Sequence, residues 1–182
     1  MISINDIHDC FVNNHKSRIK TLKETSKDDC GNNLTESIQY AYYFDKIAGD
    51  NSRSCDALFI SKQKNCIYFI EFKNQSCINA EGAPPTEFNT DLRLKAVESL
   101  NILYIILKQN NFLKNRCDLC KIKRKLIIVY SEGKTNLQID KIHRSRAFSL
   151  TGYIFQVQNY KDYLYDDIIV IPNTKFEDYK LK

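Results

Sequence analysis

The sequence predicts one layered domain of the α/β (α+β) class, and three observations predict it. Two apolar, β-branched and aromatic runs, 55–60 and 66–72, flank a short polar segment, a pattern typical of a β-hairpin. Apolar residues recur at helical spacing over about 91–109, and a further apolar run follows at 126–130. Alternation makes both faces of the hairpin apolar, so we expect other elements to cover both faces.

The composition agrees with a single globular domain, 1–182. Of the 182 residues, 43% are hydrophobic and 27% are charged, which excludes disordered and collagen-like chains. The longest uninterrupted apolar run, 102–107, is far shorter than the roughly 20 residues of a membrane-spanning helix, so no membrane association is expected. Residues 1–6 lack the pattern of a secretory signal. The odd number of cysteines, seven, favours reduced thiols and a cytoplasmic location.

Two helices are expected before the hairpin. Weak apolar periodicity predicts the first over 3–23. A better pattern predicts the second over 34–48, with Asn33 as its N-cap and Glu36 completing a capping box. Gly49 stands where a helix commonly ends. The region 1–32 is therefore interpreted as an N-terminal helical segment.

The elements after the hairpin follow from turn residues and apolar runs. Residues 75–90 contain Gly82, Pro84 and Pro85 without periodicity, which predicts a loop. The helix at 91–109 begins after a capping residue, Asn89 or Thr90.

The C-terminal part is expected to add strands to the sheet. The run 126–130 predicts a buried strand, and residues 132–150 are ambiguous. Two strands are expected at 153–157 and 168–171, within a C-terminal segment of 150–182. A last helical turn is expected at 176–179.

The hairpin register places two carboxylates opposite each other. A turn about residues 63–64 makes the numbers of opposed residues sum to 127, so Asp56 faces Glu71. Period-two alternation puts Lys73 on the same face as both. Two opposed carboxylates beside a largely buried strand pair repel each other. A shared proton, a cation or a neighbouring lysine must therefore offset the repulsion.

A hard divalent cation fits this cluster. Mg²⁺ typically takes one or two carboxylates and completes its octahedron with water and substrate phosphate. Such a cation, together with a positioned ammonium group, supplies what hydrolysis of a phosphodiester requires. The alternative is that these acidic and basic side chains form ordinary ion pairs at the protein surface, at the end of a strand. The metal interpretation requires the carboxylates of Asp56 and Glu71 to lie within reach of one ion.

The segments CDALFI (55–60) and YFIEFK (68–73) resemble the PD-(D/E)XK nuclease superfamily, although Cys55 stands where the family often has proline. The resemblance covers a core of about 34–130, in the order helix, hairpin, helix, strand. It implies a restriction-endonuclease-like fold, with a central mixed sheet of four to five strands flanked by helices.

The resemblance also implies roles for particular residues. Asp56 and Glu71 would be metal ligands, the Phe72 carbonyl would be a further ligand, and Lys73 would orient or activate the attacking water. Glu36 matches an extra acidic residue that many members carry on the preceding helix. Helix capping is the alternative role for Glu36.

Basic side chains gather in one segment, which suggests contact with a phosphate backbone. Residues 108–146 carry 11 basic and 3 acidic side chains, whereas the formal net charge of the whole chain is +5. The candidates for nucleic-acid contact in it are Lys121, Lys123, Arg124 and Lys125. Lys95, on the helix after the loop, is a further candidate. The alternatives are a solvated basic loop and an exposed lysine.

Other motifs carry less information. Cys117 and Cys120 have the spacing of zinc ligands, but a second pair is missing, with His8 and Cys10 as the nearest candidates. Free cysteines are therefore favoured over zinc. His143 lies among basic residues. It could contact nucleic acid there, and the alternative is that it belongs to an exposed loop without a partner.

The sequence as a whole predicts a Mg²⁺- or Mn²⁺-dependent phosphodiesterase that acts on DNA, compatible with a homodimer. One rival is the same fold retained as a DNA- or protein-binding module without cleavage. The other is an interaction protein stabilised by zinc at Cys117 and Cys120.

Overall fold

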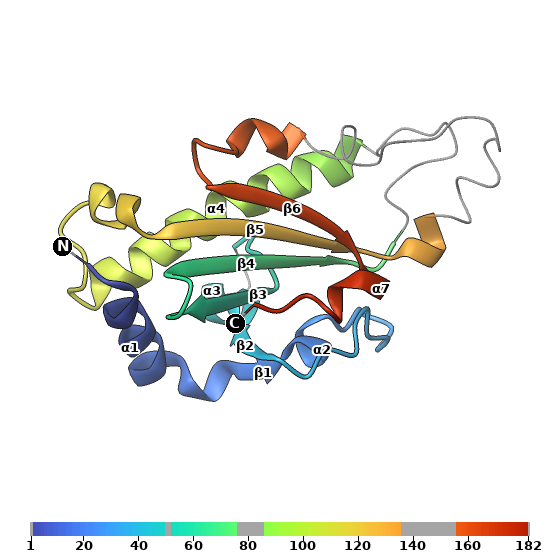
Figure 1. Ribbon diagram of the computed structural model, residues 1–182, viewed down its shortest axis with the longest axis horizontal. Helices are drawn as coiled ribbons and strands as arrows, with labels where there is room; N and C mark the ends of the chain where they lie inside the picture. Colours follow the sequence, from blue (N-terminus) through green and yellow to red (C-terminus); the bar gives the residue numbers. More distant parts are fainter. Residues whose placement is uncertain (1, 50–51, 76–85, 136–155, 182) are drawn as a thin grey trace.

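The protein is an α/β structure built on a six-stranded mixed sheet (Figure 1). The computed structural model describes residues 2–49, 52–75, 86–135 and 156–181. The strands follow one another in the order β1-β2-β3-β4-β5-β6, antiparallel from β1 to β4 and parallel from β4 to β6. The prediction of an α/β class with a mixed sheet is confirmed, but the sheet is larger than the four to five strands expected.

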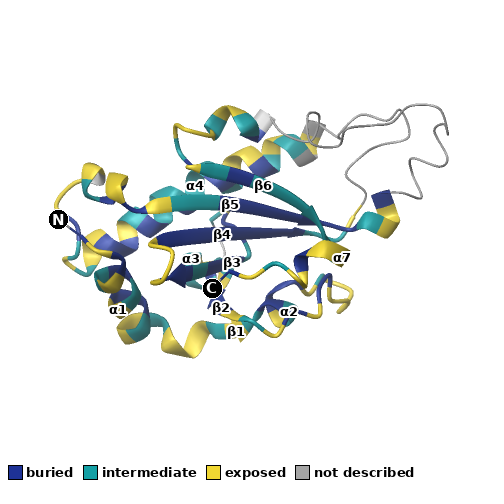
Figure 2. Cartoon of the chain, in the orientation of Figure 1, coloured by how far each residue is buried: buried dark blue, intermediate teal, exposed yellow. Residues whose placement is uncertain are grey.

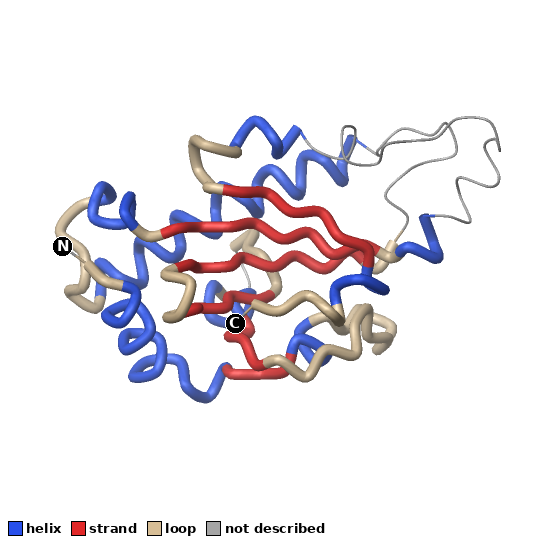
Figure 3. The backbone as a smooth tube through the Cα atoms, viewed as in Figure 1, coloured by secondary structure: helices blue, strands red, loops and turns tan. Residues whose placement is uncertain are grey.

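The elements have the following bounds. The strands are β1 (Ile19–Thr21), β2 (Tyr40–Tyr43), β3 (Ala57–Ser61), β4 (Cys66–Lys73), β5 (Lys123–Tyr130) and β6 (Asp167–Pro172). The labelled α-helices are α1 (Ile4–His15), α2 (Leu22–Thr25), α3 (Phe44–Ala48), α4 (Thr86–Gln109) and α7 (Asn173–Phe176), and 132–135 is also helical. The 3₁₀ helices of the described residues are η1 (Lys16–Arg18), η2 (Arg116–Lys121) and η3 (Gln156–Tyr160). Figure 3 colours helices, strands and loops along the chain.

The predicted hairpin is confirmed in its register. Leu58 lies opposite Phe69 and Ile60 opposite Ile67, so paired numbers sum to 127 throughout the β3–β4 ladder. The ladder starts at Ala57, which leaves Asp56 just outside its first pair. Strand β4 is buried except at Lys73, and β5 is buried from Leu126 to Tyr130 (Figure 2), as expected for central strands covered on both faces.

Each face of the sheet has its own apolar core. On one face α1, α4 and η3 pack on Leu58, Ile60, Ile67, Phe69, Leu126 and Ile128. On the other face α2, α7 and the C-terminal segment pack on Ala57, Tyr68, Ile70, Phe72, Ile127 and Val129. The two sets alternate along each strand. The prediction that both faces are covered is confirmed.

Helix α4 connects the parallel strands β4 and β5, a connection that needs a crossover element. Its apolar positions Leu92, Ala96, Leu103 and Leu107 are buried, as the periodicity predicts. It begins at Thr86, inside the expected loop 75–90, and residues 76–85 of that loop lie outside the described residues. No helix in the described part of the chain has both the length and the apolar character needed to cross a membrane.

The N-terminal helix predictions are wrong in their extent. Helix α1 begins with a Ser3 capping box but ends at His15, and 19–21 forms β1 instead of the end of a helix over 3–23. Within the region 34–48, residues 34–39 have no regular secondary structure, 40–43 form β2, and only 44–48 is helical. Aromatic residues of β2 favour a strand, and pairing with β1 and β3 outweighs the local helical periodicity.

The C-terminal predictions are partly confirmed. The strand at 168–171 is β6, and the strand at 126–130 is β5, which begins three residues earlier. Most of the strand expected at 153–157 falls on residues outside the described part, as does His143, and Val157 belongs to η3. The last helical turn, expected at 176–179, lies three residues earlier, in α7 (Asn173–Phe176).

Candidate functional site

Charged side chains converge at the carboxyl end of β4, on the face that α4 covers. Glu71 and Lys73 come from β4, where alternation points both towards α4. Asp56 immediately precedes β3, and Asp91 and Lys95 come from α4. We call these five residues the acid–lysine cluster. Three of them, Asp56, Glu71 and Lys73, are the residues that the sequence predicts as catalytic.

Two lysines bind the same carboxylate oxygen of Glu71. Lys73 Nζ lies 2.9 Å from Glu71 Oε1 and 2.8 Å from Asp91 Oδ2. Lys95 Nζ lies 2.8 Å from Glu71 Oε1 and 3.7 Å from Asp56 Oδ1. The carboxylates of Asp56 and Glu71 therefore both lie within 3.7 Å of one ammonium nitrogen. A single cation at such a position would contact both.

The backbone of β4 holds the Asp56 side chain in place. The Phe72 N–H donates a hydrogen bond of 2.6 Å to Asp56 Oδ2, and the Phe44 N–H donates to the Asp56 carbonyl at 3.0 Å. The N–H and C=O of one residue point to the same side of a strand. The Phe72 carbonyl therefore points to the Asp56 side of β4, as a further oxygen ligand there would require.

Helix α4 supplies a polar stripe that sequence reasoning missed in part. Asp91, Lys95 and Ser99 are spaced by four residues, so they share one face of the helix. Ser99 is fully buried, and its Oγ accepts a hydrogen bond of 2.9 Å from the Cys55 N–H. The interpretation of Lys95 as an exposed lysine is wrong, because its side chain lies against Asp56 and Glu71. The four-residue spacing around Lys95 is the sequence signal that could have identified Asp91 and Ser99.

Ser99→Ala is expected to destabilise the protein by about 1–3 kcal/mol, because the buried Cys55 N–H would lose its acceptor. Chemical denaturation monitored by circular dichroism measures this. Ser17→Ala, at an exposed position of η1, is the control, with an expected change below about 0.5 kcal/mol. Equal stabilities of the two variants would contradict the assigned role of Ser99.

Glu71 carries the observation that points most directly to a ligand. Its side chain is only 1% exposed. Oε1 accepts from both lysines, but Oε2 is buried and has no hydrogen-bond partner among the described residues. Buried carboxylate oxygens are normally satisfied by a donor, an ordered water or a cation. This oxygen is therefore available to a metal ion or its water.

The electrostatics of the cluster are close to balanced. Burial and the negative charge of Glu71 raise the pKa of Asp56 to about 8, against the opposing effect of the Lys95 ammonium. Burial lowers the pKa values of Lys73 and Lys95, but the carboxylates beside them outweigh burial and hold both above their ordinary values. Burial raises the pKa of Asp91, yet the hydrogen bond and the charge of Lys73, together with the other positive charges nearby, outweigh burial and lower that pKa. A cation beside Asp56 would favour its ionised form.

The donor set suits a cation that keeps several of its waters. No group of three or more His, Cys, Asp or Glu side chains with a metal-binding arrangement occurs among the described residues. A metal here would be held by Asp56, by Glu71 through its unpartnered oxygen, and by the Phe72 carbonyl. Mg²⁺ commonly uses one or two carboxylates and leaves its other positions to water and phosphate. The residues present therefore fit Mg²⁺ or Mn²⁺.

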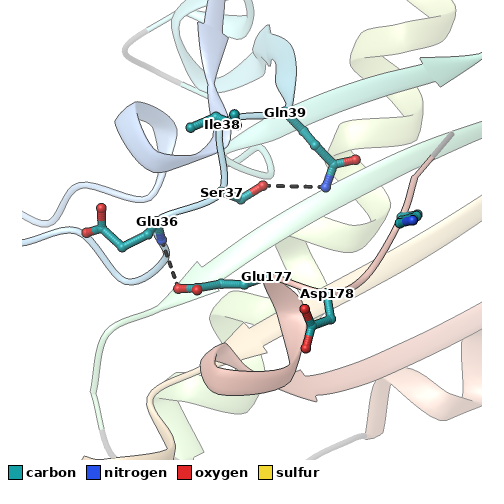
Figure 4. Close-up of a pocket in the computed structure, with 7 residues that line it drawn as sticks. Glu36, Ser37, Ile38, Gln39, Glu177 and Asp178 are labelled. Atoms are coloured by element: carbon teal, nitrogen blue, oxygen red, sulfur yellow. Dashed lines mark hydrogen bonds between the residues drawn. The ribbon is translucent and has the colours of Figure 1, made fainter.

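Glu36 does not join the acid–lysine cluster. The helix expected to carry it is absent, and its segment lies on the opposite face of the sheet, beside α7. Its carboxylate pairs with Lys23, and its backbone N–H donates to Glu177 at 3.1 Å (Figure 4). The expectation that Glu36 is a metal ligand is therefore corrected, as is its role in a helix cap.

The basic residues at the start of β5 lie at the opposite end of the sheet. Because β4 and β5 are parallel, Lys123 pairs with Cys66 while Ile128 pairs with Glu71, a separation of about 16 Å along the strand. The side chain of Lys125 pairs with Asp167 at 3.5 Å. The segment of Lys121, Lys123, Arg124 and Lys125 therefore does not line the acid–lysine cluster, and its contact with a nucleic-acid backbone stays a prediction.

The cysteine pair proposed for zinc is exposed on η2, at Cys117 and Cys120. Cys10, a candidate for the second pair, is fully buried in α1 with the other apolar residues of that helix. Within the described residues these side chains do not assemble with His8 into a group of three ligands.

A cavity of about 470 Å³ adjoins the acid–lysine cluster. Its lining residues are Arg53, Glu87, Thr90 and Asp91. Asp91 belongs to both, because its other contact is the Lys73 ammonium. Arg53 is exposed, so a guanidinium group stands at the approach to the buried carboxylates.

Comparison of the chain with protein-family models, with curated proteins and with solved structures found no match.

Proposed function

We propose that the protein is a metal-dependent phosphodiesterase that cleaves DNA, with Mg²⁺ or Mn²⁺ held between Asp56 and Glu71. The buried, unpartnered Oε2 of Glu71 is the observation that carries the proposal, because a buried carboxylate oxygen is normally satisfied and a cation held between two carboxylates would satisfy this one. The convergence of Asp56 on the same ammonium supports it. The fold supports it in part: β3, β4, α4 and β5 follow the order hairpin, helix, strand expected from the resemblance to PD-(D/E)XK nucleases, whereas the helix expected before the hairpin is only the short α3, preceded by β2.

Each residue of the cluster has a role in this proposal. When bound, the metal ion would polarise the scissile phosphate and stabilise the leaving oxygen. Lys73 presents its ammonium at the rim of the site, 12% exposed, where it can orient the attacking water. Asp91 holds that ammonium at 2.8 Å and is a positioning residue. Water and substrate reach these groups from the cavity beside Arg53.

Cleavage assays with the purified full-length chain test the proposal. Fluorescently labelled single-stranded, duplex and branched DNA are incubated with Mg²⁺, with Mn²⁺ or with EDTA. We expect cleavage that depends on Mg²⁺ or Mn²⁺ and is absent in EDTA. In Asp56→Asn, which keeps the size of the side chain but removes its charge, we expect a rate at least about a hundredfold lower.

Asp178→Asn is the matched control, because this exposed carboxylate lies beside α7 on the other face of the sheet. Its cleavage rate should equal that of the parent. A protein that leaves all three DNA forms intact with either metal contradicts the assignment of catalysis. If the intact DNA is nevertheless bound, the result favours the rival binding module.

A further inference from the structure

Lys95 occupies a position that the proposed metal ion would also need. Its ammonium contacts Glu71 at 2.8 Å and Asp56 at 3.7 Å, and these are the two carboxylates proposed as metal ligands. The side chain is 20% exposed and comes from α4, whereas the other lysine of the cluster comes from β4 itself. Lys95 thus neutralises the carboxylate pair as a cation would, but it is attached to the chain.

The two lysines of the cluster are not equivalent. Lys73 contacts Glu71 and is also held by Asp91, which is not among the proposed ligands. In the described residues the carboxylate contacts of Lys95 are Glu71 and Asp56. A metal ion that took both carboxylates would leave Lys73 its bond to Asp91, but it would deprive Lys95 of both ion pairs.

Charge makes simultaneous binding unfavourable. Three carboxylates and two ammonium groups already come close to balance, and a divalent cation would add two positive charges within a few ångströms of Lys95. Like charges at such distances repel strongly in a partly buried site. One positive group must therefore move away, and Lys95 is the one that loses its contacts.

From this geometry we infer that Lys95 is a tethered counter-ion that competes with the metal ion for Asp56 and Glu71. The inference rests on the proposed function. In the metal-free protein Lys95 holds the two carboxylates together and lowers the apparent affinity for the cation. When the cation binds, the Lys95 ammonium leaves the carboxylate pair and is free to contact a phosphate oxygen of the substrate.

Calorimetric titration of the full chain with Mn²⁺ tests the inference without relying on activity. In Lys95→Met, which keeps the length of the side chain and removes its charge, we expect the dissociation constant for Mn²⁺ to fall by about tenfold or more. Lys95→Gln should also lower the dissociation constant for Mn²⁺. It replaces Lys95→Met in the test if Lys95→Met folds poorly. Thermal unfolding adds a second measurement: in EDTA both variants should melt below the parent, and Mn²⁺ should raise their midpoints more than that of the parent.

Lys108→Met is the matched control. It makes the same change of charge on the same helix, about 20 Å from Lys95. Its Mn²⁺ affinity should equal that of the parent. If folded Lys95→Met or Lys95→Gln binds Mn²⁺ no more tightly than the parent, the inference is overturned while the metal site stands. If neither the parent nor the folded Lys95 variants bind Mn²⁺, the proposed function itself fails.

Discussion

Glu71→Gln is expected to lower the rate of DNA cleavage by at least about a thousandfold, the largest effect expected of any single change in this protein. Glutamine has the size of glutamate but carries no negative charge. The substitution would remove the anionic partner that Lys73 and Lys95 share, together with the buried oxygen proposed to face the metal. Metal binding and the positions of both ammonium groups would be lost at once.

Single-turnover cleavage with excess enzyme measures this effect, and Mn²⁺ calorimetry shows whether metal binding is lost with it. Glu177→Gln is the matched control, because that exposed side chain lies beside α7 and its amide oxygen can still accept from the Glu36 N–H. Circular dichroism establishes that both variants are folded. A folded Glu71→Gln protein that cleaves DNA at the parental rate would show that the acid–lysine cluster is not the active site.

Phe69→Ala is expected to reduce the free energy of unfolding by about 3–5 kcal/mol, the largest effect expected on stability. Phe69 is fully buried at the middle of β4. Its ring makes edge-on contacts with Phe44 and Tyr165, at centroid distances of 5.9 and 5.7 Å. Truncation would therefore remove a large apolar side chain and two aromatic contacts, and it would leave a cavity under α4.

Urea denaturation of the variant and the parent measures the difference. Tyr163→Ala is the control, because it also truncates an aromatic residue but at a position that is 78% exposed. Its expected effect is within about 0.5 kcal/mol. A loss below about 1 kcal/mol for Phe69→Ala would mean that the sheet and α4 do not pack around this ring.

The hairpin shows how far the sequence alone can specify structure. A short polar turn between two apolar runs leaves few registers, and a slip of one residue would exchange the two faces of each strand. The predicted pairing of Leu58 with Phe69 is found, and so are the predicted faces. The same register places Asp56 opposite Glu71, which is why alternation along two strands is enough to identify two residues of the candidate site.

Predictions based on local periodicity were less accurate. Residues 34–48 have apolar residues at helical spacing, but only 44–48 is helical, and Ile38, which the helix would have packed, is 78% exposed. Its strand β2 is specified by partners distant in sequence, through pairing of Tyr42 with Ile19 and with Leu58. Such long-range pairing is hard to predict from a short window of sequence, because the tendency to form a strand depends on the neighbouring strands and on the side chains that cover them.

The basic segment shows a second limit of prediction from sequence. Residues 108–146 carry an excess of positive charge, but a count of charges does not say where they lie relative to the carboxylates. Strands β4 and β5 run in the same direction, so residues at the start of β5 lie at the start of β4. Glu71 stands near the end of β4, so the basic residues and the acid–lysine cluster are separated by much of the length of the strand.

The sequence by itself determined the hairpin, its register, the buried faces and the trio Asp56, Glu71 and Lys73, because these depend on alternation over a few neighbouring residues. Only the tertiary structure decided that Asp91 and Lys95 complete the cluster and that Glu36 does not. The α4 crossover lays its polar stripe over the end of β4, whereas Glu36 packs on the opposite face. These contacts join residues that are far apart in the chain, so they depend on how helix and sheet pack.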